Sequence, residues 1–103
     1  MLNLRILFLL QKARINKQNK CPIRCRLTYN HKRREFATGQ FIMSECWYSK
    51  KQLAEPPSDE NNNINTQLSL IKSKINRAFL LLQVQEGNFS VDDIYMLYKG
   101  EVS

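Results

Sequence analysis

The residues best suited to chemistry in this sequence are the arginines of segment 22–39, which reads PIRCRLTYNHKRREFATG. Arg24, Arg26 and Arg33 stand in a regular pattern there, and Glu35 is the acidic residue of the segment. The guanidinium groups of these three arginines, against the one carboxylate of Glu35, favour the binding of a negatively charged partner. A solvated strand face without any partner is the alternative, because basic exposed strand faces are common.

The positive charge of the chain is concentrated in its first half. Residues 1–51 contain 12 Lys and Arg against 2 acidic residues, whereas residues 52–103 contain 4 against 7. A one-sided basic field indicates a polyanionic partner, with nucleic acid as the first candidate and an anionic membrane as the second. The segment 12–20 adds further basic residues without an acid, so it is either a solvated connection or a phosphate-binding arm.

Several kinds of site find no support in the sequence. The chain has one histidine, and its cysteines at 21, 25 and 46 form no paired CxxC set, so we expect no metal. No glycine-rich phosphate loop, G-x-S-x-G motif or converging carboxylate pair occurs, so we expect no catalytic residue, cofactor or small-molecule substrate. The odd number of cysteines favours reduced thiols in a cytoplasmic setting. The apolar run 6–10 is far shorter than the roughly 20 residues that span a bilayer, and no signal-peptide cleavage site follows it.

Segment 22–39 predicts a β-hairpin that places its arginines on one face. Apolar residues alternate with polar ones from Ile23 to Tyr29, which is the period of a half-buried strand. The polar break 30–33 predicts a tight turn, and a loop of His31 and Lys32 fixes the register. The predicted partners are Asn30 with Arg33, Thr28 with Glu35, Leu27 with Phe36, Arg26 with Ala37, and Cys25 with Thr38. The predicted polar face consists of Arg24, Arg26, Thr28, Asn30, Arg33 and Glu35, and no aromatic residue is expected on it.

The rest of the chain predicts one more strand and two helices. Residues 5–11 predict a first strand with Ile6, Phe8 and Leu10 in the core, and with Arg5, Leu7, Leu9 and Gln11 on the other side. The apolar stripe of a long helix is formed by Ile64, Leu68, Ile71, Ile75, Ala78, Phe79 and Leu82. A short helix is predicted from Ser90 to Gly100, with Asp93 in a capping box. We also expect a helix that starts at Ser44, a structural role for Trp47 and a flexible connector over 54–63.

These elements predict an α+β fold in a single domain. A long amphipathic helix needs an apolar surface, and the underside of the sheet is the candidate for it. We therefore expect a three-stranded antiparallel sheet with one face packed on the long C-terminal helix, a short terminal helix, and the polar face bare. Residues 1–100 form this domain in the prediction.

In their order and spacing, several of these motifs resemble a known family. They are the run Ile6, Phe8 and Leu10, the basic Asn-Lys loop, the segment 22–26, the turn 30–33, the end 35–39 and the run Trp47, Lys50, Lys51 and Gln52. Together they resemble the N-terminal arm-type DNA-binding domain of tyrosine recombinases, found in integrases of phages and conjugative transposons. The resemblance implies sequence-specific binding of double-stranded DNA, with the sheet in the major groove of arm-type sites. It also implies a bacterial cytoplasmic location, neighbouring integrase protomers as further partners, and residues 101–103 as the start of a linker to core-binding and catalytic domains.

Carried onto this sequence, the resemblance assigns two sets of contacts. Base edges are assigned to Arg24, Arg26, Thr28, Asn30, Arg33 and Glu35. Phosphates are assigned to Lys12, Arg14, Lys17, Lys20, Lys32 and Arg34. No residue of this chain is assigned to catalysis, so we do not expect an enzyme.

Two other functions use the same basic face. An RNA-binding module presents a similar sheet, although sheets that bind single strands stack bases on exposed aromatic residues. A protein-interaction domain would dock an acidic partner on the basic face, with Leu7 and Leu9 as a small apolar patch.

Overall fold

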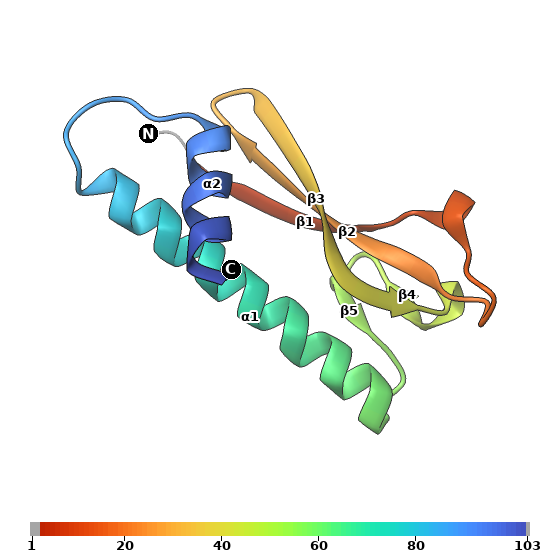
Figure 1. The fold of residues 1–103 in the computed structure, drawn as a ribbon. Coiled ribbons are helices and arrows are strands. Elements are labelled where there is room, and N and C mark those ends of the chain that lie inside the picture. Colours follow the sequence, from red (N-terminus) through yellow and green to blue (C-terminus); the bar gives the residue numbers. More distant parts are fainter. Residues whose placement is uncertain (1–2, 103) are drawn as a thin grey trace.

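The computed structural model describes residues 3–102, and it shows a three-stranded antiparallel sheet with two helices on one side (Figure 1). The fold class is therefore α+β, as the sequence predicts. The strand order is β1-β2-β3 in the main sheet, and a separate two-stranded sheet follows in the chain. The elements are β1 (Arg5–Leu10), β2 (Cys21–Tyr29), β3 (Lys32–Ile42), β4 (Trp47–Tyr48), β5 (Leu53–Ala54), α1 (Asp59–Gln83) and α2 (Val91–Val102).

Strand β2 lies at the centre of the sheet and separates a buried side from an open side. Its odd-numbered residues, from Cys21 to Tyr29, are all buried, and the residues between them are half-buried. The buried side packs on the predicted stripe of α1, in which Ile64, Leu68 and Ile75 are buried. The predicted alternation in β2 and the predicted apolar stripe of α1, with its spacing of three to four residues, are both confirmed.

The underside of the sheet is covered by both helices together. Figure 1 shows α2 lying across α1 beside the β2–β3 hairpin. Phe36 of β3 contacts the rings of Tyr95 and Tyr98, with ring centroids 5.1 and 5.3 Å apart. The short helix is therefore part of the core. Its capping box is confirmed, because Ser90 Oγ accepts from the Asp93 amide and Asp93 Oδ2 accepts from the Ser90 amide.

The predicted hairpin partners are wrong, whereas the predicted division into faces is right. The two-residue loop is Asn30-His31, with φ angles of +52° and +65°. Hairpin turns of this length favour positive φ at both positions, and Asn and His adopt that region more readily than most residues. Thr28 consequently pairs with Arg33, and Arg26 with Glu35. Each partner on β3 moves by two residues, so every side chain keeps its face.

The predicted helix after Ser44 is wrong. Ser44–Cys46 is a single 3-10 turn, and the chain then forms the small sheet of β4 and β5. The amide of Gln52 accepts from the Phe8 N–H at 2.7 Å and donates to the Phe8 carbonyl at 3.2 Å. This side chain thereby satisfies backbone groups on the outer edge of β1, where no further strand of the described residues is paired. Long-range bonds of this kind fix segment 44–54, and local propensity does not show them.

The predicted flexible connector is also wrong over its second half. Helix α1 begins at Asp59, inside the predicted connector, and the side chain of Ser58 caps it by accepting from the Asn61 amide at 3.0 Å. Asp59 and Glu60 add negative charge to the first turn, which favours a helix start. At its other end the connector is fixed as well, because the Asn65 amide bonds both backbone groups of Ala54.

Candidate nucleic-acid interface

The sheet side opposite the helices is made of alternate residues from the three strands, and we call it the open face. Strand pairing arranges it as four rows of three, because residues directly opposite each other share a side. The rows are Arg5–Thr28–Arg33, Leu7–Arg26–Glu35, Leu9–Arg24–Ala37 and Gln11–Pro22–Phe41. All twelve residues are exposed or half-buried, whereas the opposite side of the sheet forms the core.

Four arginines give the open face a net positive charge. Arg24, Arg26 and Arg33 were predicted for this face, and Arg5, the first residue of β1, lies beside them as the predicted alternation of the first strand indicates. Arg5 is nevertheless missing from the predicted DNA contacts. Its row lines a hollow on the three strands, together with Leu7 and Arg26 of the next row. The face thus presents several guanidinium groups on a rigid support.

Glu35 lies among these arginines and pairs with one of them. Arg26 Nε donates to Glu35 Oε2 at 2.8 Å, and the two side chains are 28% and 37% exposed. They come from directly opposite positions on β2 and β3, so the contact follows from the register. The pair lies at the middle of the open face and points an oriented guanidinium and a carboxylate away from the core.

The structure brings together five of the six predicted base-contacting residues. Arg24, Arg26, Thr28, Arg33 and Glu35 all lie on the open face. Asn30 does not, because it is the first residue of the two-residue turn. It stands at the hairpin end of the sheet, beyond the row of Thr28 and Arg33.

The six predicted phosphate-contacting residues lie in three places. Lys12, Arg14 and Lys17 are exposed in the β1–β2 connection, and Lys32 is exposed at the start of β3. The other two are bound to the helices. Lys20 Nζ lies 2.5 Å from Glu60 Oε1 of α1, and Arg34 Nη1 lies 3.1 Å from Asp92 Oδ1 of α2. The Arg34 guanidinium also lies over the Tyr95 ring, 4.2 Å from its centroid.

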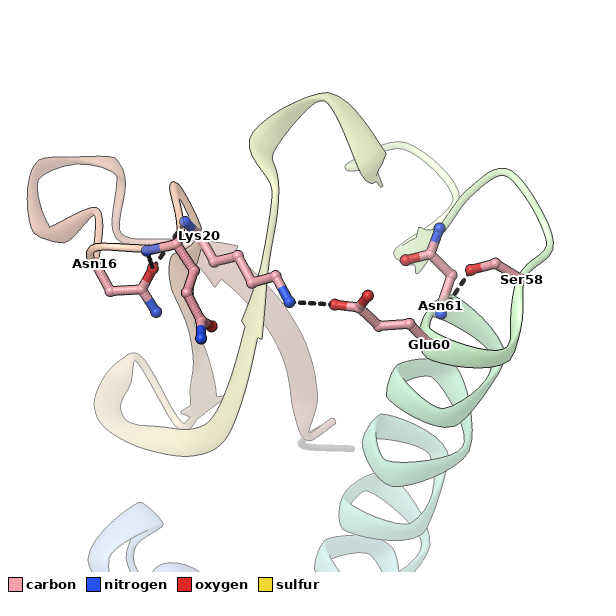
Figure 2. Close-up of polar contacts among 6 residues, drawn as sticks. Asn16, Lys20, Ser58, Glu60 and Asn61 are labelled. Atoms are coloured by element: carbon pink, nitrogen blue, oxygen red, sulfur yellow. Dashed lines mark hydrogen bonds and ion pairs between the residues drawn. The ribbon is translucent and has the colours of Figure 1, made fainter.

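The β1–β2 connection has a defined shape, and Figure 2 shows it beside the first turn of α1. The side-chain oxygen of Asn16 accepts from the amides of Gln18 and Lys20 at 2.9 and 3.0 Å. The Asn16 amide in turn donates to the Lys20 carbonyl at 2.9 Å. The side chain of Lys20 extends from this turn to Glu60, so it ties the connection to the first turn of α1 (Figure 2).

The prediction that the polar face has no aromatic residue is wrong. Strand β3 continues past Gly39, which has a φ of +83°, and runs to Ile42. The pairing is irregular there, but the alternation is preserved, so Phe41 lies opposite Pro22 on the open face. Phe41 is 43% exposed. The predicted hairpin ended at Gly39, so the sequence prediction did not assign Phe41 to either face.

The cysteines and the remaining acidic residues do not form a second chemical site in the part of the chain that the structure describes. No group of three or more His, Cys, Asp or Glu between residues 3 and 100 is arranged to hold a metal ion. Burial raises the pKa of the Cys25 thiol to about 12, so this group is neutral at physiological pH. Within residues 3–102, neither helix has the length and apolar character needed to cross a membrane.

Comparison with known proteins adds one finding to this geometry. A family model described as an arm DNA-binding domain matches residues 8–95, which run from β1 to α2. No curated protein and no solved structure matches the chain. The matched stretch contains ten of the twelve residues of the open face, all except Arg5 and Leu7.

Proposed function

The chain belongs to the arm DNA-binding domain family, and on that basis we propose that it binds duplex DNA by placing its open face in the major groove. The dimensions support this arrangement. Three strands spaced by about 4.8 Å are roughly 10 Å across. The major groove of B-DNA is about 12 Å wide, so a narrow sheet fits into it with its side chains directed at base edges. The observation that supports the proposal best is the cluster of four arginines on the side of the sheet that the helices leave open.

In this arrangement the side chains of the open face contact base edges, and residues at the two ends of the sheet contact the phosphate backbone of the DNA. Arg24, Arg26 and Arg33 donate to guanine O6 and N7, since a guanidinium matches these two acceptors in one plane. Thr28 and Glu35 contact neighbouring base edges, and Glu35 suits the amino group of cytosine. Asn30 reaches a base or the backbone from the turn at the hairpin end.

Phosphate contacts come from both ends of the sheet. Lys12, Arg14 and Lys17 hold the backbone at one end, and Lys32 holds it at the other. Lys20 and Arg34 stay with their helix carboxylates in this proposal and position the loop and α2. They can reach phosphates only by giving up these ion pairs.

An arm DNA-binding domain has no catalytic function of its own, so the proposed role is that of an accessory domain. We place it in a site-specific integrase of the tyrosine recombinase type, where it binds arm-type sites away from the positions of strand exchange. Neighbouring integrase protomers are the further partners of such a domain. Binding to DNA would place the protein at the bacterial nucleoid.

A direct test maps the surface that meets DNA. A duplex is first selected by the 103-residue chain from a random pool, and its binding is then followed by amide chemical shifts. We expect the largest changes along β1, β2 and β3 and small changes along the outer surface of α1. Absence of duplex binding at about 50 mM salt would refute the proposal, because phosphate contacts are strong at low salt.

The same experiment separates duplex DNA from single-stranded RNA. Phe41 is an exposed aromatic residue on the open face, and sheets that bind single strands stack bases on such side chains. These proteins combine several aromatic residues, whereas the four rows of the open face contain Phe41 alone. We therefore expect the selected duplex to compete strongly and single-stranded RNA of the same sequence to compete weakly.

A further inference from the structure

Five of the twelve residues of the open face are apolar, and the proposed arginine contacts do not explain them. Leu7 and Leu9 of β1 and Phe41 of β3 point away from the core, and we call them the apolar strip. Leu7 is 38% exposed and Phe41 is 43% exposed. The side chains that point the other way from the same strands, such as Phe8 and Ile42, are almost completely buried.

We propose that the apolar strip recognises the 5-methyl groups of thymines, an inference that rests on the proposed insertion of the open face into the major groove. The thymine methyl is the apolar group that base edges present in that groove. A leucine or phenylalanine directed at the base edges therefore has one preferred partner there. The strip distinguishes T·A from C·G and from the other base pairs at positions that the arginines do not reach.

The pairing of β1 with β2 determines which recognised bases are neighbours in the DNA site. Leu7 is directly opposite Arg26, and Leu9 is directly opposite Arg24. Each arginine therefore has a leucine one strand away, at about 4.8 Å, while successive base pairs are about 3.4 Å apart. A guanidinium that binds guanine consequently places its leucine on a base pair close to that guanine. The bound sites are expected to contain guanines with thymines near them.

The charge of the surrounding rows favours DNA over a protein as the occupant of the strip. Any partner that covers Leu7 and Leu9 also covers Arg24 and Arg26, because they share two rows. A second copy of the chain would bring the same positive face, which repels it. Duplex DNA supplies acceptors for the guanidinium groups and methyl groups for the leucines at the same time.

The test removes the methyl groups and nothing else. The duplex selected by the wild-type chain is compared with the same duplex in which deoxyuridine replaces every thymine. Burial of one methyl group changes affinity by about fourfold, so the wild type should lose that factor for each methyl it contacts. Leu7→Ala, Leu9→Ala and Phe41→Ala should each bind the thymine duplex more weakly and lose part of the preference for thymine over uracil.

Two control variants identify the cause. Arg26→Ala should bind both duplexes more weakly and keep the preference for thymine. Leu80→Ala removes a leucine of α1 that is 60% exposed and lies off the sheet, so it should leave both affinities unchanged. Thermal unfolding of each variant shows whether the fold is intact.

The outcomes separate this inference from the proposed function. Equal wild-type affinity for the two duplexes would overturn the inference and leave duplex binding in place. A preference for thymine that is undiminished in all three strip variants would overturn it as well, because the methyl groups would then act elsewhere. If the chain binds no duplex, the proposed function itself fails. Loss of self-association in Leu7→Ala or Phe41→Ala, without loss of thymine preference, would assign the strip to contacts between copies.

Discussion

Replacement of Glu35 by Gln tests how a carboxylate can serve within a face that binds a polyanion. Glu35 accepts a hydrogen bond from Arg26 Nε at 2.8 Å, and this bond does not use the terminal nitrogens of the guanidinium. A glutamine keeps the shape and removes the charge. We expect the variant to bind random duplex DNA more tightly and to distinguish the selected sequence less well.

The size of each expected effect follows from the position of the Arg26–Glu35 pair on the open face. At about 4 Å in water one charge pair is worth about 1 kcal/mol, so loss of the repulsion between Glu35 and phosphate should strengthen binding to random DNA about fivefold. The dependence of log K on log salt should become steeper by about 0.9, because one more cation acts on the DNA. A well-oriented guanidinium contributes about 1–3 kcal/mol of base discrimination, and partial loss of orientation should reduce the specificity ratio by roughly tenfold.

Fluorescence anisotropy with the selected duplex and a random duplex, at several salt concentrations, measures all three quantities. The matched control is Glu55→Gln, which removes the same charge and breaks the Lys51–Glu55 ion pair, in which neither residue is assigned to DNA. Both pairs are at least partly exposed to solvent, so either substitution should cost less than about 1 kcal/mol of stability. Equal strengthening on both duplexes by Glu35→Gln would show that Glu35 only repels DNA and does not orient Arg26.

Four further predictions concern single residues. Arg26→Ala should weaken binding to the selected duplex by about 1–3 kcal/mol and relax one base preference, whereas Lys17→Ala should weaken all duplexes alike and reduce the salt slope by about 0.9. Equal losses of Arg26→Ala on selected and random DNA, measured by anisotropy, would refute its role in base contact. Gln52→Ala should lower the free energy of unfolding by about 1–3 kcal/mol, because it leaves the N–H and carbonyl of Phe8 at the edge of β1 without these bonds, and chemical denaturation measures this. The Cys25 thiol, whose pKa burial raises to about 12, should stay protonated and unreactive toward alkylating reagents at pH 8 in the folded chain; rapid labelling of Cys25 seen by mass spectrometry under native conditions would contradict its burial.

The sequence alone determined the elements that depend on periodicity. Alternation in β2 assigned Arg24 and Arg26 to one side and Ile23, Cys25 and Leu27 to the other, and the structure confirms this division. The apolar stripe of α1 and the capping box of α2 were equally evident, because both are patterns over a few residues. These features follow from local geometry, in which a side chain's position along the chain fixes its direction.

The tertiary structure decided what depends on residues far apart in the chain. The hairpin register followed from positive φ at Asn30 and His31, and it brought Glu35 rather than Ala37 opposite Arg26. Lys20 forms an ion pair with Glu60, which is forty residues later in the chain, and Arg34 forms one with Asp92. No local pattern encodes such contacts, because they arise only when packing of the core fixes the helices against the sheet. The sequence therefore specified which residues could bind DNA, and packing determined which of their charges remain at the open face.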